Sequence, residues 1–127
     1  MIQEYHFGSI TIDGKIYNHD VEVRWNEEVL KWWREESHVI DVEDVKRAIE
    51  QNPETIVIGT GESGVAKVTE KAKEEIKSKG IELITDITGE AIKTFNIINE
   101  KSEKEEGKQR KVIGLFHCIM PDTYCTL

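Results

Sequence analysis

The order of apolar and polar residues predicts that the chain begins with a β-meander. The two kinds of residue alternate over residues 5–17, with an Asp-Gly dipeptide at 13–14. Asp-Gly between two apolar runs is a strong β-hairpin signal. Residues 21–25 then read Val-Glu-Val-Arg-Trp, which predicts a strand with one face in water. Residues 29–34 suit a helix or a strand, and we favour the strand because a meander needs a returning strand.

Two continuous apolar runs predict strands in the interior of a sheet. Residues 56–58 read Ile-Val-Ile, and residues 112–116 read Val-Ile-Gly-Leu-Phe. Neither run alternates with polar residues, which is typical of strands covered on both faces. We therefore expect both runs to be buried and to lie in the same sheet. A third strand is predicted over residues 81–86.

Three stretches carry the periodicity of helices. Asp41 can cap a helix over residues 42–51. A second pattern begins at Val65, directly after a group of glycines, so that strand, helix and following strand form a βαβ unit. Thr88 can cap a third helix, for which Gly107 is a natural C′ residue. These elements predict an α/β protein.

Composition excludes several classes of partner. The 127 residues are expected to form one domain, with residues 121–127 as a short tail. Charged residues make up 33% of the chain and the net charge is -8, which disfavours nucleic acids and anionic membranes as partners. The first residues lack the features of a signal peptide, so we expect a cytoplasmic protein. The Glu- and Lys-rich composition leans towards a thermophile.

A glycine motif supplies the first candidate site. Residues 59–64 read Gly-Thr-Gly-Glu-Ser-Gly and match the G-x-G-x-x-G pattern of dinucleotide-binding loops. A β-meander precedes the motif and no second half of a dinucleotide fold follows it, so we expect no NAD and no other cofactor. Two interpretations remain: a tight turn with a serine helix cap, or an anion site at a helix N-terminus. The candidate anion-binding residues are Gly59, Thr60, Gly61, Ser63 and Gly64.

The histidines do not form a catalytic or metal-binding set in the sequence. None has the spacing of a metal motif. His117 and Cys118 are neighbours on a predicted strand, so their side chains point to opposite faces and cannot form a nucleophile-base pair. We therefore name no catalytic residue and no metal ligand. Ser37, His38 and His117 are candidates for lining a pocket beside the glycines.

The tryptophans supply a candidate interface. Trp32 and Trp33 are adjacent, so they point to opposite sides if the stretch is a strand. An exposed tryptophan is favoured where proteins meet, which would fit a protein partner or a homo-oligomer. The alternative is that all three tryptophans of the chain pack as a small second core.

Several short strings, taken in order, resemble a known family. They are Phe7-Gly8, Ile12-Asp13-Gly14, Tyr17, His19-Asp20, Ser37-His38, Pro53, Ile56 to Gly61, Gly64, Gly107 and His117. The chain resembles the small α/β family of the adipogenesis-associated domain proteins, which is related to a mitochondrial complex I assembly factor. The resemblance runs from about Phe7 to Met120.

This resemblance implies a three-layer fold. An N-terminal β-meander would precede a mixed five-stranded sheet with helices on both faces, and the last strand would lie inside the sheet, antiparallel to its neighbours. No activity is established for the family. Our first interpretation is a non-catalytic domain that binds a partner or a small ligand. The alternative is a small enzyme, or a nucleotide or phosphate binder, that uses the loop at residues 59–64.

Overall fold

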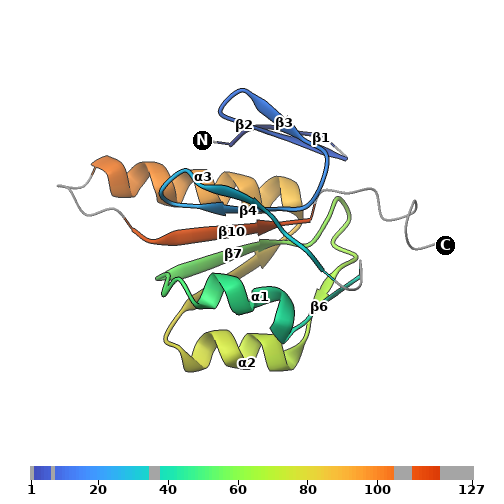
Figure 1. Cartoon of the computed structure of the whole chain (residues 1–127), viewed down its shortest axis with the longest axis vertical. Coiled ribbons are helices and arrows are strands. Elements are labelled where there is room, and N and C mark those ends of the chain that lie inside the picture. The colour runs from blue at the N-terminus through green and yellow to red at the C-terminus, as the bar shows by residue number, and fades with distance from the viewer. Residues whose placement is uncertain (1, 7, 35–37, 105–109, 118–127) are drawn as a thin grey trace.

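The computed structural model describes residues 2–6, 8–34, 38–104 and 110–117, with the backbone alone for 101–104 (Figure 1). Ser37, Gly107 and the tail at 121–127 lie outside the described residues. The strands are β1 (Ile2–His6), β2 (Ser9–Ile12), β3 (Lys15–Tyr17), β4 (Val21–Arg24), β5 (Val29–Lys31), β6 (Val39–Ile40), β7 (Thr55–Gly59), β8 (Lys67–Val68), β9 (Glu82–Asp86) and β10 (Val112–Phe116). The helices are α1 (Val42–Ile49), α2 (Glu70–Ser78) and α3 (Thr88–Lys104).

The central sheet has five strands in the order β5-β4-β10-β7-β9. As predicted from their continuous apolar runs, β7 and β10 are fully buried neighbours in this sheet. β10 is parallel to β7 and antiparallel to β4, so the expectation that it opposes both neighbours was wrong. The reason is that α3 carries the chain from β9 back across the sheet as a crossover, which makes β10 run in the direction of β7.

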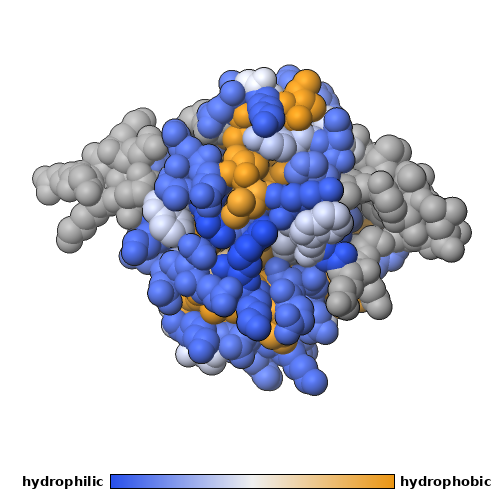
Figure 2. All heavy atoms as spheres, in the orientation of Figure 1, coloured by the Kyte–Doolittle hydropathy of each residue, from blue (hydrophilic) through white to orange (hydrophobic). Residues whose placement is uncertain are grey.

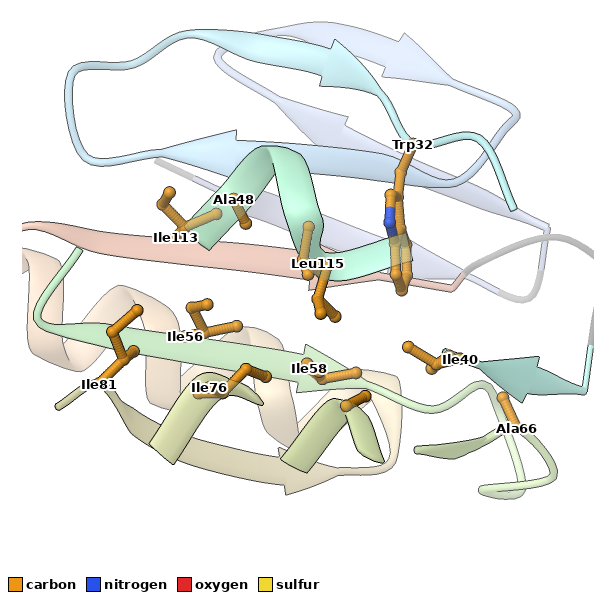
Figure 3. Close-up of a cluster of buried hydrophobic side chains, with 12 residues drawn as sticks. Trp32, Ile40, Ala48, Ile56, Ile58, Ala66, Ile76, Ile81, Ile113 and Leu115 are labelled. Carbon is orange, nitrogen blue, oxygen red and sulfur yellow. The ribbon is translucent and has the colours of Figure 1, made fainter. Parts of the chain in front are cut away.

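Helices cover both faces of this sheet, and the predicted three-layer α/β class is confirmed. One face packs against α3 and the three-stranded sheet β1-β2-β3, which together form one apolar core. The other face packs against α1 and α2. Figure 3 shows the side chains of this second core pointing into the space between the helices and the strands. They include Trp32, Ile40, Ile56, Ile58, Ile76, Ile113 and Leu115.

The glycine loop does not open a helix, contrary to the sequence pattern. Residues 67–68 form β8, which pairs in parallel with β6, and α2 begins only after it. The N-cap of α2 is Thr69, whose side chain accepts a hydrogen bond from the Ala72 N–H; Ser63 does not have this role. The backbone N–H of Lys67 donates to the His38 carbonyl at 2.9 Å, so pairing with a distant strand overrides the local helical pattern.

The cap of α1 agrees with the sequence. Asp41 accepts a hydrogen bond from the Val42 N–H at 2.8 Å, and Asp44 completes a capping box. The Thr69 hydroxyl also donates to Asp41, at 2.9 Å, which ties the starts of α1 and α2 together. The hydrogen bond from the Val42 N–H, and to a lesser extent the one from the Thr69 hydroxyl, lower the pKa of Asp41 from its usual value.

The strand β4 has no wet face, although its alternation predicted one. Glu22 is only 1% exposed because α1 covers this side of the strand. Its carboxylate accepts from Arg24 Nε at 2.8 Å and from Arg47 Nε at 3.0 Å. Two guanidinium groups therefore balance the buried charge, and removing one of them would leave it poorly compensated.

The buried position of β7 leads to the first prediction. Ile58→Ala should lower the free energy of unfolding by about 2–5 kcal/mol, because it deletes a fully buried branched side chain. Ile97→Ala is a suitable control, since Ile97 is 53% exposed on α3, and it should change stability by no more than about 0.5 kcal/mol. Chemical denaturation measures both. Equal effects of the two substitutions would contradict the position of β7.

Candidate functional site

The candidate site lies where the parallel strands of the central sheet end. Gly59 at the end of β7 is paired with Asp86 at the end of β9 and with Phe116 at the end of β10. Phe116 is also opposite Val21, the first residue of β4. The loops that follow β7, β9 and β10, and the loop that precedes β4, therefore meet at one edge. Open α/β sheets commonly bind ligands outside the carboxyl ends of their strands.

A buried charged cluster stands at this edge. Asp20 precedes β4, Arg34 follows β5 and His117 follows β10. Arg34 donates to Asp20 Oδ2 from Nε at 3.0 Å and from Nη2 at 2.9 Å. His117 Nδ1 is 2.9 Å from the same carboxylate oxygen and 2.6 Å from Arg34 Nη2. Asp20 and Arg34 form an ion pair, and the imidazole, 2% exposed, is held against both of them.

The second ring nitrogen of His117 is left without a partner among the described residues. Nδ1 can either donate to Asp20 or accept from Arg34, and each choice fixes the tautomer of the ring. In both tautomers Nε2 is buried, and no described residue forms a hydrogen bond with it. Buried polar atoms are almost always paired, so an unpaired one at the edge of the sheet where ligands commonly bind marks a functional candidate.

The glycine loop, residues 59–64, is tied to this cluster through Thr88. The Thr88 hydroxyl donates to the His117 carbonyl at 2.6 Å and accepts from the Gly61 N–H at 2.8 Å. The Thr88 N–H in turn donates to the Gly61 carbonyl at 3.0 Å, and the His117 N–H donates to the Gly59 carbonyl at 3.0 Å. Thr88 is fully buried, so these hydrogen bonds are shielded from water. The sequence predicts that its hydroxyl caps α3; in the structure it joins two loops instead.

Close packing explains why glycine occupies two positions of the loop. A Cβ at Gly59 would lie 3.0 Å from the Thr88 Cα, a backbone atom that cannot move aside. Gly61 has φ +104°, and a Cβ there would lie 3.0 Å from His117 Cδ2 and 3.8 Å from Nε2. The loop can therefore cover the imidazole only because residue 61 has no side chain.

A cavity of about 260 Å³ lies against the same loop. Thr60 and Gly64 form part of its wall, and Lys67 and Lys73 are among its lining residues. The Lys73 ammonium is 3.4 Å from Glu70 Oε1. It is lined by Thr60, Gly64, Ala66, Lys67, Val68, Lys73, Thr85, Asp86 and Ile87. Thr60 is held in place by Asp86, whose carbonyl accepts from the Thr60 N–H at 2.9 Å and from its hydroxyl at 3.0 Å.

Of the predicted pocket-lining residues, the structure places His117 against the glycine loop. The carbonyl of half-buried His38 instead pairs with Lys67 of β8, beyond the end of the loop. The two tryptophans separate. Trp32 is 4% exposed and donates from Nε1 to the Asp44 carbonyl, so it presents no surface to a partner, whereas Trp33 is 72% exposed.

Sequence reasoning missed the residues that complete the site. In the sequence, Asp20 belongs to one of the strings that carry the family resemblance but has no assigned role, and Arg34 is one charge among many. Nothing local links them to His117, since they meet only after the sheet has formed. The helical pattern places Lys67 and Lys73 on a solvent face. In the described ranges, no three His, Cys, Asp or Glu side chains gather closely enough to hold a metal ion.

With the fold and the site described, the chain can be placed in a family. A family described as a protein of unknown function (DUF498/DUF598) matches residues 2–117, and the chain belongs to it. No curated protein matches the chain. The fold alone is shared with the conserved hypothetical protein PH1505 from Pyrococcus horikoshii OT3, at 24% identity and a TM-score of 0.76, over 94% of this chain and 99% of that one.

Two further solved structures are similar. MT938 is 27% identical, with a TM-score of 0.74, over 94% of this chain and 98% of that chain. A structure described as an outer membrane protein from Bartonella henselae is 21% identical, with a TM-score of 0.76 and 94% of each chain covered. Among the described residues of our protein, no helix has both the length and the apolarity needed to span a membrane.

The tight fit at Gly61 leads to the second prediction. Gly61→Ala should destabilise the protein more than Gly80→Ala. Gly80 has φ +73°, and a Cβ there would meet nothing within 4 Å, so its substitution adds only backbone strain, about 1–2 kcal/mol. At Gly61 the added carbon also presses on a buried ring, which should cost about 1–3 kcal/mol more. Thermal unfolding compares the two variants, and equal losses would contradict the contact between the loop and His117.

Proposed function

We propose that the protein is a small-ligand-binding domain that holds an anionic compound in the cavity beside the glycine loop. The observation that carries this proposal is the position of Lys67 and Lys73 on the wall of a cavity at the carboxyl ends of β7 and β9. Ligand sites occur preferentially at such strand ends. The candidate loop residues Gly59, Thr60, Gly61, Ser63 and Gly64 keep their proposed role as the frame of this site.

The size of the cavity limits the ligand. About 260 Å³ corresponds to roughly nine water molecules at about 30 Å³ each. A phosphate or carboxylate group with a few attached carbon atoms fits this volume. The Gly61 N–H is already used by Thr88, so the anion would depend on the lysines more than on the loop backbone.

Attraction of an anion to this cavity must come from nearby lysines, because the protein as a whole is negatively charged. With a net charge of -8, the protein as a whole repels anions, so no long-range field draws one in. Asp86 also lies in the cavity wall, although its Oδ1 accepts from the Ile87 N–H. The two ammonium groups must therefore be within direct reach of the ligand, and added salt should weaken its binding.

The alternative is a small enzyme, and the Asp20–His117 pair is the observation that favours it. A carboxylate that holds one nitrogen of an imidazole is a frequent arrangement in general acid-base catalysis. Nε2, however, is covered by Gly61, and His117 is not among the residues that line the lysine cavity. A substrate in the cavity would reach it only after the loop had moved. We therefore rank ligand binding ahead of catalysis.

The third prediction tests the lysines. Inorganic phosphate added to the wild-type protein should bind in the millimolar range or tighter, and Lys67→Gln with Lys73→Gln should weaken it by about tenfold, as expected when charge-assisted hydrogen bonds are lost. Lys93→Gln is a matched control. Lys93 pairs with Glu90 three residues earlier, as Lys73 does with Glu70, but lies on α3. Isothermal titration gives the affinities, and equal weakening by the control would refute the site.

A second candidate function is the binding of a protein partner or of another copy of the chain. Its support is Trp33, which is 72% exposed beside the edge strand β5, with the Lys31 ammonium 4.2 Å from the centre of its ring. Figure 2 shows a mostly hydrophilic face with a narrow apolar strip on its upper half. Exposed tryptophans are enriched among the residues that dominate protein interfaces.

The fourth prediction concerns this tryptophan. If the chain self-associates through Trp33, sedimentation velocity over a concentration series should show a dimer in the wild type that is lost in Trp33→Ala. Ile16→Ala, at another exposed apolar residue, is the control and should leave the dimer intact. A wild-type protein that stays monomeric at every concentration would remove the homo-oligomer from consideration.

The finer family resemblance is also part of the proposal. We infer a relation to the adipogenesis-associated domain proteins and to the complex I assembly factor from the ordered strings around Asp13, His38 and His117. A cytoplasmic location and a thermophilic source remain proposals drawn from the sequence. None of these inferences is needed for the ligand site, which depends on the cavity alone.

A further inference from the structure

The glycine loop is a wall shared by two features of the site. On one side, Gly61 covers the ring of His117 so closely that a Cβ on residue 61 would lie 3.0 Å from Cδ2. On the other side, Thr60 and Gly64 line the lysine cavity. Any change that displaces the loop from the imidazole therefore changes the shape of the cavity as well.

We propose that His117 is a positioning residue for the glycine loop, and that protonation of its ring releases the loop and weakens anion binding in the cavity. This inference rests on the proposed function. It is carried by the Nε2 atom, which has no partner among the described residues and is buried under a residue without a side chain. With a neutral ring, the loop can close over the imidazole at the cost of one unmade hydrogen bond.

Protonation changes that balance whichever neutral tautomer is present. The doubly protonated ring carries an N–H on Nε2, and no described residue accepts a hydrogen bond from this position. The ring also becomes a cation 2.6 Å from the Arg34 guanidinium. The carboxylate of Asp20 partly offsets the repulsion between these two positive charges. A buried charged donor without an acceptor is far more costly than a neutral one. Moving Gly61 aside admits water to Nε2, so the protonated form favours an open loop.

Other ionisable groups lie near the loop, and their contacts differ from those of His117. Glu62, the ionisable residue of the loop itself, is exposed, and its Oε2 accepts from the Tyr5 hydroxyl on β1 at 2.8 Å. From the start of α3, Thr88 contacts the loop through its hydroxyl and its backbone N–H, neither of which titrates. Asp86 directs one carboxylate oxygen to the Ile87 N–H. Among the described residues, Asp20 and Arg34 are the charged groups in contact with the imidazole, and the His19 ring lies 2.9 Å from the Asp20 backbone carbonyl.

The sign of the effect distinguishes release of the loop from simple attraction. Histidine ordinarily gains its proton between pH 8 and pH 5. If charge alone mattered, an added cation near the cavity would tighten anion binding as the pH falls. Release of the loop predicts the opposite, because the wall formed by Thr60 and Gly64 is displaced. Sulfate is the suitable probe, since its own charge does not change in this range.

The experiment measures sulfate affinity at pH 5.5 and pH 7.5 by amide ¹H–¹⁵N titration. In the wild type, binding at pH 5.5 should be weaker by about fivefold or more, the size of a typical coupling. His117→Asn should abolish the difference, because an asparagine amide can donate to Asp20 but does not titrate. His6→Asn is the control; the His6 side chain is 73% exposed on β1, and the pH dependence should persist.

Each other outcome decides the question. Tighter sulfate binding at pH 5.5, or the same pH dependence in His117→Asn, would overturn the inference. If sulfate binds at neither pH, the proposed function fails. The coupling between His117 and the loop is then tested in the wild type without a ligand. The Gly61 amide should then shift with the same midpoint as the His117 ring signals, whereas a Gly61 amide indifferent to that titration would refute the coupling. If His117→Asn does not fold, the pH titration of the Gly61 amide in the wild type decides the question in the same way.

Discussion

The hydroxyl of Thr88 joins the loops on which the candidate site depends. It donates to the His117 carbonyl and accepts from the Gly61 N–H, and it is fully buried. A hydroxyl offers one donor and can accept as well, so a single small side chain fixes two loops that are distant in the sequence. Because the group is shielded from water, losing either partner would leave a buried polar atom unpaired. The geometry of the glycine loop and of His117 follows from this junction.

The central sheet explains why charged residues gather at this edge. β4 enters the sheet where β10 leaves it, so the residue before one strand and the residue after the other are neighbours. Asp20 and His117 occupy these two positions, and Arg34 returns to them after the edge strand β5. The ion pair permits an imidazole to be buried beside a carboxylate without an uncompensated charge. The topology of the strands thus places a buried imidazole and a pair of lysines at the same edge.

The sequence predicted those features that depend on local pattern. The absence of polar alternation identified β7 and β10 as buried neighbours, and Asp41 was correctly predicted to cap α1. The glycines and His117 were named as neighbouring candidates, and the structure places Gly61 directly against the His117 ring. Two of the errors share one physical cause, which is contact between segments that are distant in the sequence. β8 forms because its backbone pairs with β6. Glu22 can be buried because Arg47 from α1 forms an ion pair with it.

The central claim is that the cavity beside the glycine loop binds an anion through Lys67 and Lys73. Mapping of amide shifts on addition of phosphate tests it most directly, because the map locates the ligand without a variant. We predict that the shifts concentrate on the residues that line the cavity, Thr60, Gly64, Lys67 and Lys73 among them. Shifts spread evenly over lysines of the whole surface, with the cavity unchanged, would contradict it.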